Sequence, residues 1–398
     1  MKKIKEEIQK LSKKYFDEIV DYRRSLHKYP ELFFQEYKTS EFIASKLTEF
    51  GISFTKGIAK TGIVGLIEGK HPNSKVVLLR ADIDALPLVE ENNIDYKSKN
   101  KGVMHACGHD VHIASLLGTL KILNKIKDKF HGSIKFIFQP SEEKFPGGAI
   151  AMINEGVLEN PKPDNVFGQH VFPELEVGKI GLRPGKYMAS SDEIILRIKG
   201  KGGHGAIPHA TIDPVIIASH ILVALQQISS RYAAHDMPTV LSFGKILANG
   251  SFNIIPDEVY IEGTFRTFDE TWRYKAHQRI NEIAKAIAKG MGGSCEVDIF
   301  VGYPALVNDE LTTKNTKKYA IEYLGKHNVI DLDVRMTAED FAYFSERIPS
   351  CFYRLGVKNE EKGIISNLHT PKFNVDENCL ETGMGLMAWI AINELNNN

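Results

Sequence analysis

Apolar residues in the first half of the chain alternate between strand-like and helix-like spacing. The run KVVLLRADID (residues 75–84) is β-branched and rich in leucine, which is typical of a strand buried in a parallel sheet. Further strands are expected at 61–69, 133–140 and 164–171, and helices at 2–29, 37–50 and 147–158. This alternation predicts an α/β fold with a mostly parallel sheet flanked by helices.

The pattern changes near Ser190. From there the chain reads as strand, helix, two strands, helix and strand, with the two helices at 213–231 and 271–293. This β-α-β-β-α-β order is typical of a ferredoxin-like α+β unit, in which one small sheet is backed by two helices. We therefore expect an inserted domain at 190–303, between two parts of a main domain at 1–189 and 304–398.

The amino-acid composition excludes several classes of protein function. The 398 residues carry 50 Lys+Arg and 50 Asp+Glu, so the basic excess expected of a nucleic-acid-binding protein is missing. The Lys-rich start lacks the apolar run of a secretory signal, and the most apolar window, 214–225, is too short to span a bilayer. Four cysteines without a C-x-x-C pair favour a reducing compartment. A soluble, cytoplasmic protein is expected.

Candidate chemistry begins with MHACGHDVH (residues 104–112). Cys107, His109 and the following Asp110 offer a thiolate, an imidazole and a carboxylate just before a predicted helix, which would make half of a metal site. The competing interpretation is a buried cysteine beside surface histidines. The density of potential ligands in this segment, bracketed by glycine, favours metal ligation.

Further ligand-type residues follow predicted strands. Glu142 and Glu143 lie at the end of strand 133–140, and His170 lies at the end of strand 164–171. Ligands of open α/β sheets bind outside the carboxyl ends of the strands, where Asp84 is also expected. His369, in a polar loop, would complete the group.

Together these residues suit a dinuclear metal centre. The predicted ligands are Cys107, His109, Glu143, His170 and His369. Two divalent ions about 3.5–4 Å apart can activate a water molecule and polarise a carbonyl group. Mixed sulfur, nitrogen and oxygen ligands suit Mn²⁺ or Zn²⁺, with Co²⁺ or Ni²⁺ as alternatives, rather than Mg²⁺ or Ca²⁺. Glu142, unbound to metal, would accept the proton of the water and pass it to the leaving nitrogen.

These motifs resemble the M20 metallopeptidase family over about residues 15–395. The resemblance is closest to its amidohydrolase branch, which contains aminoacylases, hippurate hydrolases, indole-acetyl-amino-acid hydrolases and N-acetyldiaminopimelate deacetylases. Nine segments carry it in order: RADIDALP, MHACGHDVH, QPSEE, FGQHV, GKGGHGAIPH, NIIPD, GTFRTF, AEDFAYF and LHTPKFNVDE. It implies the same five ligands and a catalytic domain formed by 1–189 and 304–398. It also implies that Glu142 is the general base and that Asp84 orients a metal ligand.

The same resemblance implies that 190–303 is a lid and dimerisation domain. Its His204 would reach the active site of the partner subunit in a homodimer, or in a dimer of dimers, and stabilise the developing oxyanion. Asn253 and Arg266 match family positions that hold the carboxylate of the substrate, a task suited to a guanidinium group. Without the resemblance, Arg266 would be interpreted as a surface arginine of a strand. His105 and His112 match no ligand position.

The predicted function is metal-dependent hydrolysis of the amide bond of N-acyl-L-amino acids, such as N-acetyl or N-benzoyl compounds. One departure from the family is the run PSEEKFPGG (residues 140–148), where the branch commonly has P-A-E-E-G, so acyl specificity is not transferred. A dipeptidase or carboxypeptidase on the same scaffold is the main alternative. A binding protein without catalysis and a hydrolase with Cys107 as nucleophile are two others.

Overall fold

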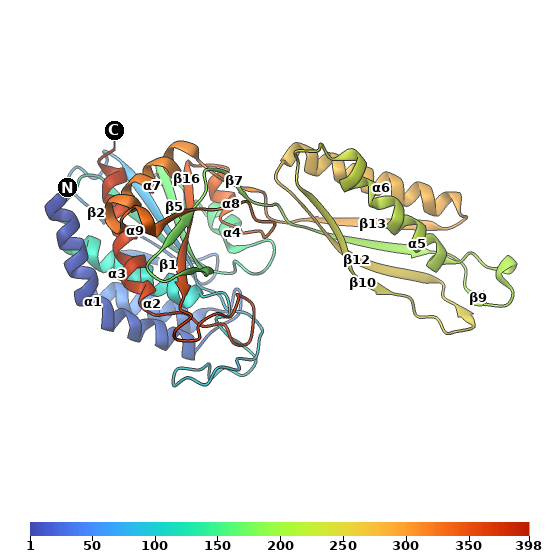
Figure 1. Cartoon of the computed structure of the whole chain (residues 1–398), viewed down its shortest axis with the longest axis horizontal. Helices are drawn as coiled ribbons and strands as arrows, with labels where there is room; N and C mark the ends of the chain where they lie inside the picture. Colours follow the sequence, from blue (N-terminus) through green and yellow to red (C-terminus); the bar gives the residue numbers. More distant parts are fainter. Residues whose placement is uncertain (398) are drawn as a thin grey trace. The chain divides into compact units, whose positions relative to one another are not determined.

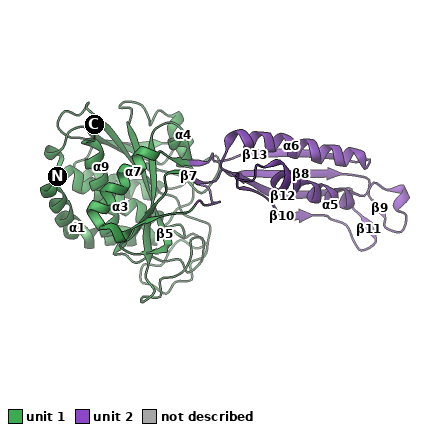
Figure 2. Ribbon diagram, turned by 45° about the horizontal axis from the view of Figure 1, so that its top comes forward, with its two compact units in different colours: residues 1–185, 307–333, 340–398 green, residues 186–306, 334–339 purple. Residues whose placement is uncertain are grey.

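The computed structural model describes residues 1–397, which form two compact units (Figure 2). Unit 1 contains Met1–Gly185, Val307–Asp333 and the chain from Asp340 onwards, and unit 2 contains Lys186–Leu306 and Val334–Glu339. The short segment Val334–Glu339 therefore groups with the inserted part of the chain, although the sequence pattern assigns it to the main domain.

Unit 1 is built on an eight-stranded sheet with the order β1-β2-β4-β3-β5-β16-β6-β15. Its four central strands β4, β3, β5 and β16 run parallel, whereas β1, β2 and β4 pair antiparallel. The strands are β1 (Phe54–Ile58), β2 (Gly62–Glu68), β3 (Val76–Asp82), β4 (Ser133–Gln139), β5 (Asn165–Glu176), β6 (Ile180–Leu182), β15 (Val329–Asp331) and β16 (Ser350–Lys358). β3 and β4 are buried along their whole length, as strands covered on both faces must be.

Helices pack against this sheet and against each other (Figure 1). They are α1 (Lys2–Lys28), α2 (Tyr37–Glu49), α3 (His109–Lys125), α4 (Gly148–Asn154), α7 (Glu310–Leu324), α8 (Ala342–Ser345) and α9 (Cys379–Leu395). α1, α3 and α9 contact one another, and α3 and α9 also contact β3. The predicted α/β fold of this unit is confirmed.

A buried ion pair links α1 to the first turn of α3. Arg23 Nε donates to Asp110 Oδ2 at 2.7 Å, and both side chains are completely buried. His27 Nδ1 lies 2.7 Å from the same oxygen. Asp110 thus connects two helices, and among the described residues it belongs to none of the candidate metal-ligand groups, although the sequence pattern places it in a metal half-site.

Unit 2 has a four-stranded antiparallel sheet with the order β10-β12-β8-β13. Its elements are β8 (Asp192–Lys199), β9 (Gly203–His204), α5 (Pro214–Leu225), β10 (Thr239–Leu247), β11 (Ile254–Ile255), β12 (Glu258–Thr267), α6 (Glu270–Gly290) and β13 (Ser294–Val301). The paired strands β7 (Gly185–Met188) and β14 (Leu306–Asn308) contain the residues at which the chain passes from one unit to the other. With β8 and β12 in the centre, this is the ferredoxin-like order that the sequence predicts. Asp213 caps α5 by accepting hydrogen bonds from Val215 and Ile216.

Unit 2 also leaves apolar side chains exposed on α5 and on the edge strand β10. Ile216 and Val223 of α5 are exposed, as are Ile246 and Leu247 of β10. An edge strand carries unpaired backbone groups that can pair with another chain. Within residues 1–397, no helix has both the length and the apolar character that spanning a bilayer requires.

The Arg23–Asp110 pair yields a stability prediction. Arg23→Leu leaves the Asp110 carboxylate buried without its cation, which typically costs about 3–5 kcal/mol of unfolding free energy. Urea denaturation would measure this loss. The matched control is Arg24→Leu, because Arg24 pairs with Glu377 at the surface, where such pairs contribute about 0–1 kcal/mol. Equal losses in the two variants would contradict the anchoring role of Arg23.

Candidate metal centre and active site

The parallel strands of unit 1 end at the same edge of the sheet. β3 ends at Asp82, with Asp84 two residues later, and β4 ends at Gln139, just before Glu142 and Glu143. His170 lies in the neighbouring strand β5. Topology therefore brings together residues that are far apart in the sequence.

A glycine turn places Cys107 and His109 at this edge. Gly108 has a φ of 79°, and a Cβ atom there would lie 2.5 Å from Val171 Cγ2 of β5. Glycine thus allows both the left-handed turn and the close approach to β5. α3 begins with His109, whose side chain is completely buried.

His369 completes the group from the loop before α9. It has a φ of 59°, and its backbone N–H donates to Ala106 O at 2.9 Å, next to Cys107. Its Nε2 lies 3.4 Å from Cys107 Sγ and 3.1 Å from Glu143 Oε1.

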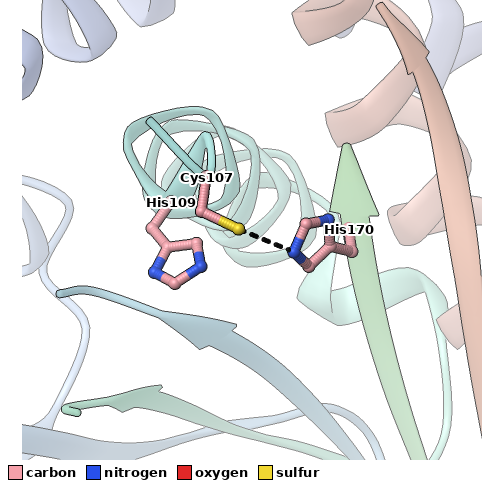
Figure 3. A group of neighbouring side chains, drawn as sticks. All are labelled: Cys107, His109 and His170. Atoms are coloured by element: carbon pink, nitrogen blue, oxygen red, sulfur yellow. Dashed lines mark hydrogen bonds between the residues drawn. The ribbon is translucent and has the colours of Figure 1, made fainter. Parts of the chain in front are cut away.

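The five predicted ligands form two groups of three that share Cys107. One group is Cys107, His109 and His170, and the other is Cys107, Glu143 and His369; the ligand atoms within each group lie within 4.8 Å of one another. Figure 3 shows the sulfur of Cys107 directed at the ring of His170, 3.4 Å from its Nε2, with His109 beside them. The sulfur of Cys107 is therefore available to both groups.

The donor atoms also fit a cation. Among the described residues, neither ring nitrogen of His109 makes a hydrogen bond of normal geometry, although both are buried. Burial and the charges of Glu143 and Glu142 raise the pKa of the Cys107 thiol well above its usual value. Burial opposes the protonation of His109, but the charge of Asp82 helps to raise its pKa to about 10. A divalent cation would offset the negative charge, and its coordination would require a thiolate and a neutral imidazole.

Asp84 connects the two glutamates to His109. Its Oδ1 accepts a hydrogen bond from the backbone N–H of Glu142 and its Oδ2 accepts one from that of Glu143, both at 3.0 Å. His109 Nδ1 lies 3.3 Å from Asp84 Oδ1. The Asp84 side chain thereby fixes the backbone that carries Glu142 and faces a candidate ligand.

His112 has a position that the sequence did not indicate. Its Nδ1 donates to Asp82 Oδ1 at 2.5 Å, and its Nε2 accepts from the backbone N–H of Val171 at 2.9 Å. Its ring lies 4.6 Å from that of His170, between centroids. The only sequence signal is its spacing from His109, since residues three apart share a helix face.

The three predicted residues of unit 2 fall into two places. His204 lies in β9, and the N–H of the next residue donates to the carbonyl of Asn253, so both belong to one end of the unit, near β9 and β11 in Figure 2. Arg266 lies near the far end of β12, where it donates to Met336 O at 3.1 Å. At about 3.3 Å per residue, Arg266 is roughly 26 Å along the strand from Glu258, where β12 begins.

Comparisons with known proteins identify the family of this chain. The profile of Peptidase family M20/M25/M40 matches residues 78–393. An N-acyl-L-amino acid amidohydrolase of Geobacillus stearothermophilus is 45% identical over 304 residues, which cover 76% of this chain and 81% of that protein. Thermostable carboxypeptidase 1 of Saccharolobus solfataricus is 39% identical and covers 98% of both chains. The crystal structure of the Bacillus subtilis YXEP protein, described as a dinuclear metal binding peptidase from the M20 family, has a TM-score of 0.84 with 34% identity, covering 97% of this chain and 99% of that one.

The chain therefore belongs to peptidase family M20, and it is an amide-hydrolysing enzyme. The resemblance noted from its motifs is confirmed. Its donor groups make it a candidate metal-binding protein.

Metal content should depend on Cys107. In Cys107→Ser a hydroxyl replaces the shared thiolate, and a hydroxyl is a much poorer ligand for borderline-soft ions. Elemental analysis after reconstitution with Mn²⁺ or Zn²⁺ should show clearly less metal per chain than in the wild type. Cys351→Ser is the matched control, since Cys351 is buried in β16 and belongs to neither group. Full occupancy in Cys107→Ser would contradict ligation by Cys107.

Proposed function

We propose that this enzyme hydrolyses the amide bond of N-acyl-L-amino acids and releases a carboxylic acid and a free amino acid. The observation that carries this proposal is a pair of donor groups that share Cys107, with Glu142 beside them. Relatives support the substrate class, because two of them are named N-acyl-L-amino acid amidohydrolase and N-acetyl-L-cysteine deacetylase.

The residues that would hold two divalent ions are Cys107, His109, Glu143, His170 and His369. The bound ions would supply Lewis acidity, which polarises the amide carbonyl and lowers the pKa of water. Mn²⁺ and Zn²⁺ suit these ligands best, and Co²⁺ and Ni²⁺ suit them also.

Glu142 is the proposed general base. It is 6% exposed and groups with His109 and Glu143, so its carboxylate faces the candidate ligands. It would take the proton of the attacking water and deliver it to the leaving nitrogen. Asp84 would act by holding the backbone N–H groups of Glu142 and Glu143, and so would position the base.

Arg266 and Asn253 are the proposed partners of the substrate carboxylate, and His204 is the proposed donor to the oxyanion. Burial lowers the pKa of Arg266, yet its guanidinium stays charged and can bind a carboxylate through two nitrogens. His204 and Asn253 belong to one end of unit 2 and Arg266 to another part of β12. One copy of unit 2 therefore cannot present all three residues to one small substrate, which favours a site shared between two subunits.

Self-association through unit 2 would supply the second copy. The exposed apolar residues of α5 and the edge strand β10 offer a surface for a homodimer, which could pair again into a dimer of dimers. The four cysteines are buried and form no disulfide within the described residues, as is typical of cytoplasmic proteins, and we propose that the enzyme is cytoplasmic.

A carboxypeptidase or dipeptidase activity is the second candidate, because relatives include two thermostable carboxypeptidases. A panel of N-acetyl-, N-benzoyl- and aminoacyl-amino acids, assayed after chelation and reconstitution with each metal, would separate the candidates. Preferential hydrolysis of the N-acyl compounds supports the proposal. Preference for substrates with a free α-amino group would refute it. Activity that survives complete metal removal would instead favour a cysteine nucleophile.

Glu142→Gln tests the general base. An amide cannot accept the proton of water, so kcat should fall by about 10²–10⁴ while metal content and folding are retained. Steady-state kinetics and elemental analysis on the same preparation would measure both. Glu174→Gln is a suitable control, since Glu174 lies in the exposed end of β5. A fall of less than about tenfold would rule out this role.

Mixing two inactive variants tests the shared site. His204→Ala should lower kcat by about 10²–10³ through loss of an oxyanion donor, without loss of metal. If His204 acts in the partner's site, a heterodimer of His204→Ala and Glu142→Gln contains one site with both groups intact. Activity should then return on subunit exchange. No recovery, with exchange verified by native mass spectrometry, would mean that His204 does not act across the interface.

A further inference from the structure

A second buried carboxylate, Glu36, lies at the turn that carries the proposed base. Glu36 precedes α2 and is completely buried, although no motif in the sequence singles it out. It occupies the N-cap position of α2 but makes no capping hydrogen bond with its side chain. The carboxylate is therefore directed to partners other than its own helix.

Those partners come from three separate segments. Glu36 Oε1 accepts hydrogen bonds from the backbone N–H groups of Phe34 at 2.9 Å and Ser141 at 3.0 Å. Its Oε2 accepts one from the hydroxyl of Thr61 at 2.7 Å. A buried carboxylate with three donors is well satisfied, and it links the first loop of the chain to the segment after β4.

The backbone of Ser141 has a conformation that must be stabilised by its surroundings. It has a φ of 51°, a left-handed conformation that is unfavourable for residues other than glycine. Such a conformation persists only where the surroundings impose it. The carbonyl of Ser141 also accepts from Gly148 N at 2.8 Å, so both backbone polar groups of Ser141 are hydrogen-bonded.

The turn thus directs three consecutive N–H groups at two buried carboxylates. Ser141 donates to Glu36, and Glu142 and Glu143 donate to Asp84. Asp84 alone would fix the two glutamates but would leave the residue that sets the direction of the turn without an acceptor.

We infer that Glu36 is a positioning residue for Glu142: its carboxylate holds the left-handed turn at Ser141 and thereby aims the base. This inference rests on the proposed function for the role of Glu142, but the hydrogen bond to Ser141 can be tested without it. A misplacement of about 1 Å at a reacting group can cost about 10² in rate, so the effect should be visible in kcat.

In this role the side chain of Glu36 must accept a hydrogen bond from the N–H of Ser141, whereas its negative charge is not required. Burial and then the nearby Asp84 raise the pKa of Glu36 to about 7, so the site already tolerates a neutral side chain. Glu36→Gln keeps the length and one acceptor oxygen. Glu36→Asp keeps the charge but is one methylene too short to reach Ser141. Comparing these two variants distinguishes the effect of the hydrogen-bond acceptor from the effect of the negative charge.

The kinetic experiment compares Glu36→Gln, Glu36→Asp and Glu36→Ala on an N-acyl amino acid that the wild type hydrolyses. Glu36→Gln should keep kcat within about threefold, whereas Glu36→Asp and Glu36→Ala should lose about tenfold or more, with KM and metal content little changed. If Glu36→Ala does not fold, the comparison of Gln with Asp decides the question.

Glu31→Ala is the matched control from the same loop. Glu31 Oε2 accepts from the N–H and hydroxyl of Thr39 at 2.8 and 3.0 Å and has no hydrogen bond to residues 141–143. Its loss should lower the melting temperature but leave kcat unchanged. If kcat in Glu31→Ala falls as far as in Glu36→Ala, the effect is a general loosening of the loop and the inference fails.

Amide hydrogen exchange of metal-free protein gives a readout that does not depend on activity. A peptide covering 139–147 should exchange faster in Glu36→Asp and Glu36→Ala, but not in Glu36→Gln or Glu31→Ala. The inference fails if hydrogen exchange of this peptide is unchanged in Glu36→Ala. It also fails if kcat falls equally in Glu36→Gln and Glu36→Asp. A wild type that hydrolyses no N-acyl amino acid refutes the proposed function instead, while the exchange result still stands.

Discussion

The burial of negative charge at one edge of the sheet is the constraint on which this structure depends. Asp82, Asp84, Glu142 and Glu143 gather there because parallel strands end together. Buried carboxylates are costly unless cations or hydrogen-bond donors compensate them. Arg80 pairs with Asp82 at 2.6 Å, and backbone N–H groups satisfy Asp84. The remaining charge faces a thiol and imidazoles, which is the environment that a divalent cation would stabilise.

Around this centre, carboxylates act mainly on the backbone. Asp84 and Glu36 accept from consecutive N–H groups of one turn, and Asp110 holds α1 against the start of α3 through Arg23. Each of these contacts fixes the backbone at or next to a candidate ligand or base without involving the side chain of that ligand or base. The rigid placement that catalysis demands is therefore spread over residues that need not touch the substrate. This explains why several buried acidic residues of unit 1 lie in loops and at helix ends.

Two features of unit 2 concern its exposed side chains and its predicted site residues. Its core lies between α5, α6 and one face of the sheet, while apolar side chains such as Val223 and Ile246 stay exposed. The distance along β12 separates Arg266 from the end of the unit that carries His204 and Asn253. In the proposed homodimer, a second copy of unit 2 would account for both features.

Local pattern was sufficient to predict the fold class, which is confirmed, and to propose the five candidate ligands. The periodicity of strands and helices depends on residues that are close together in the sequence, so it can be seen in the sequence. Thiol, imidazole and carboxylate groups that follow predicted strands can be recognised as potential metal ligands from their residue types. Tertiary structure alone decided which groups share Cys107, which role Asp110 has, and that His112 packs beside His170. The same holds for Glu36, because its partners lie far away in the sequence and become neighbours only when the first loop packs against the turn after β4. Contacts between distant segments leave no local period, and so they could not be predicted from one sequence.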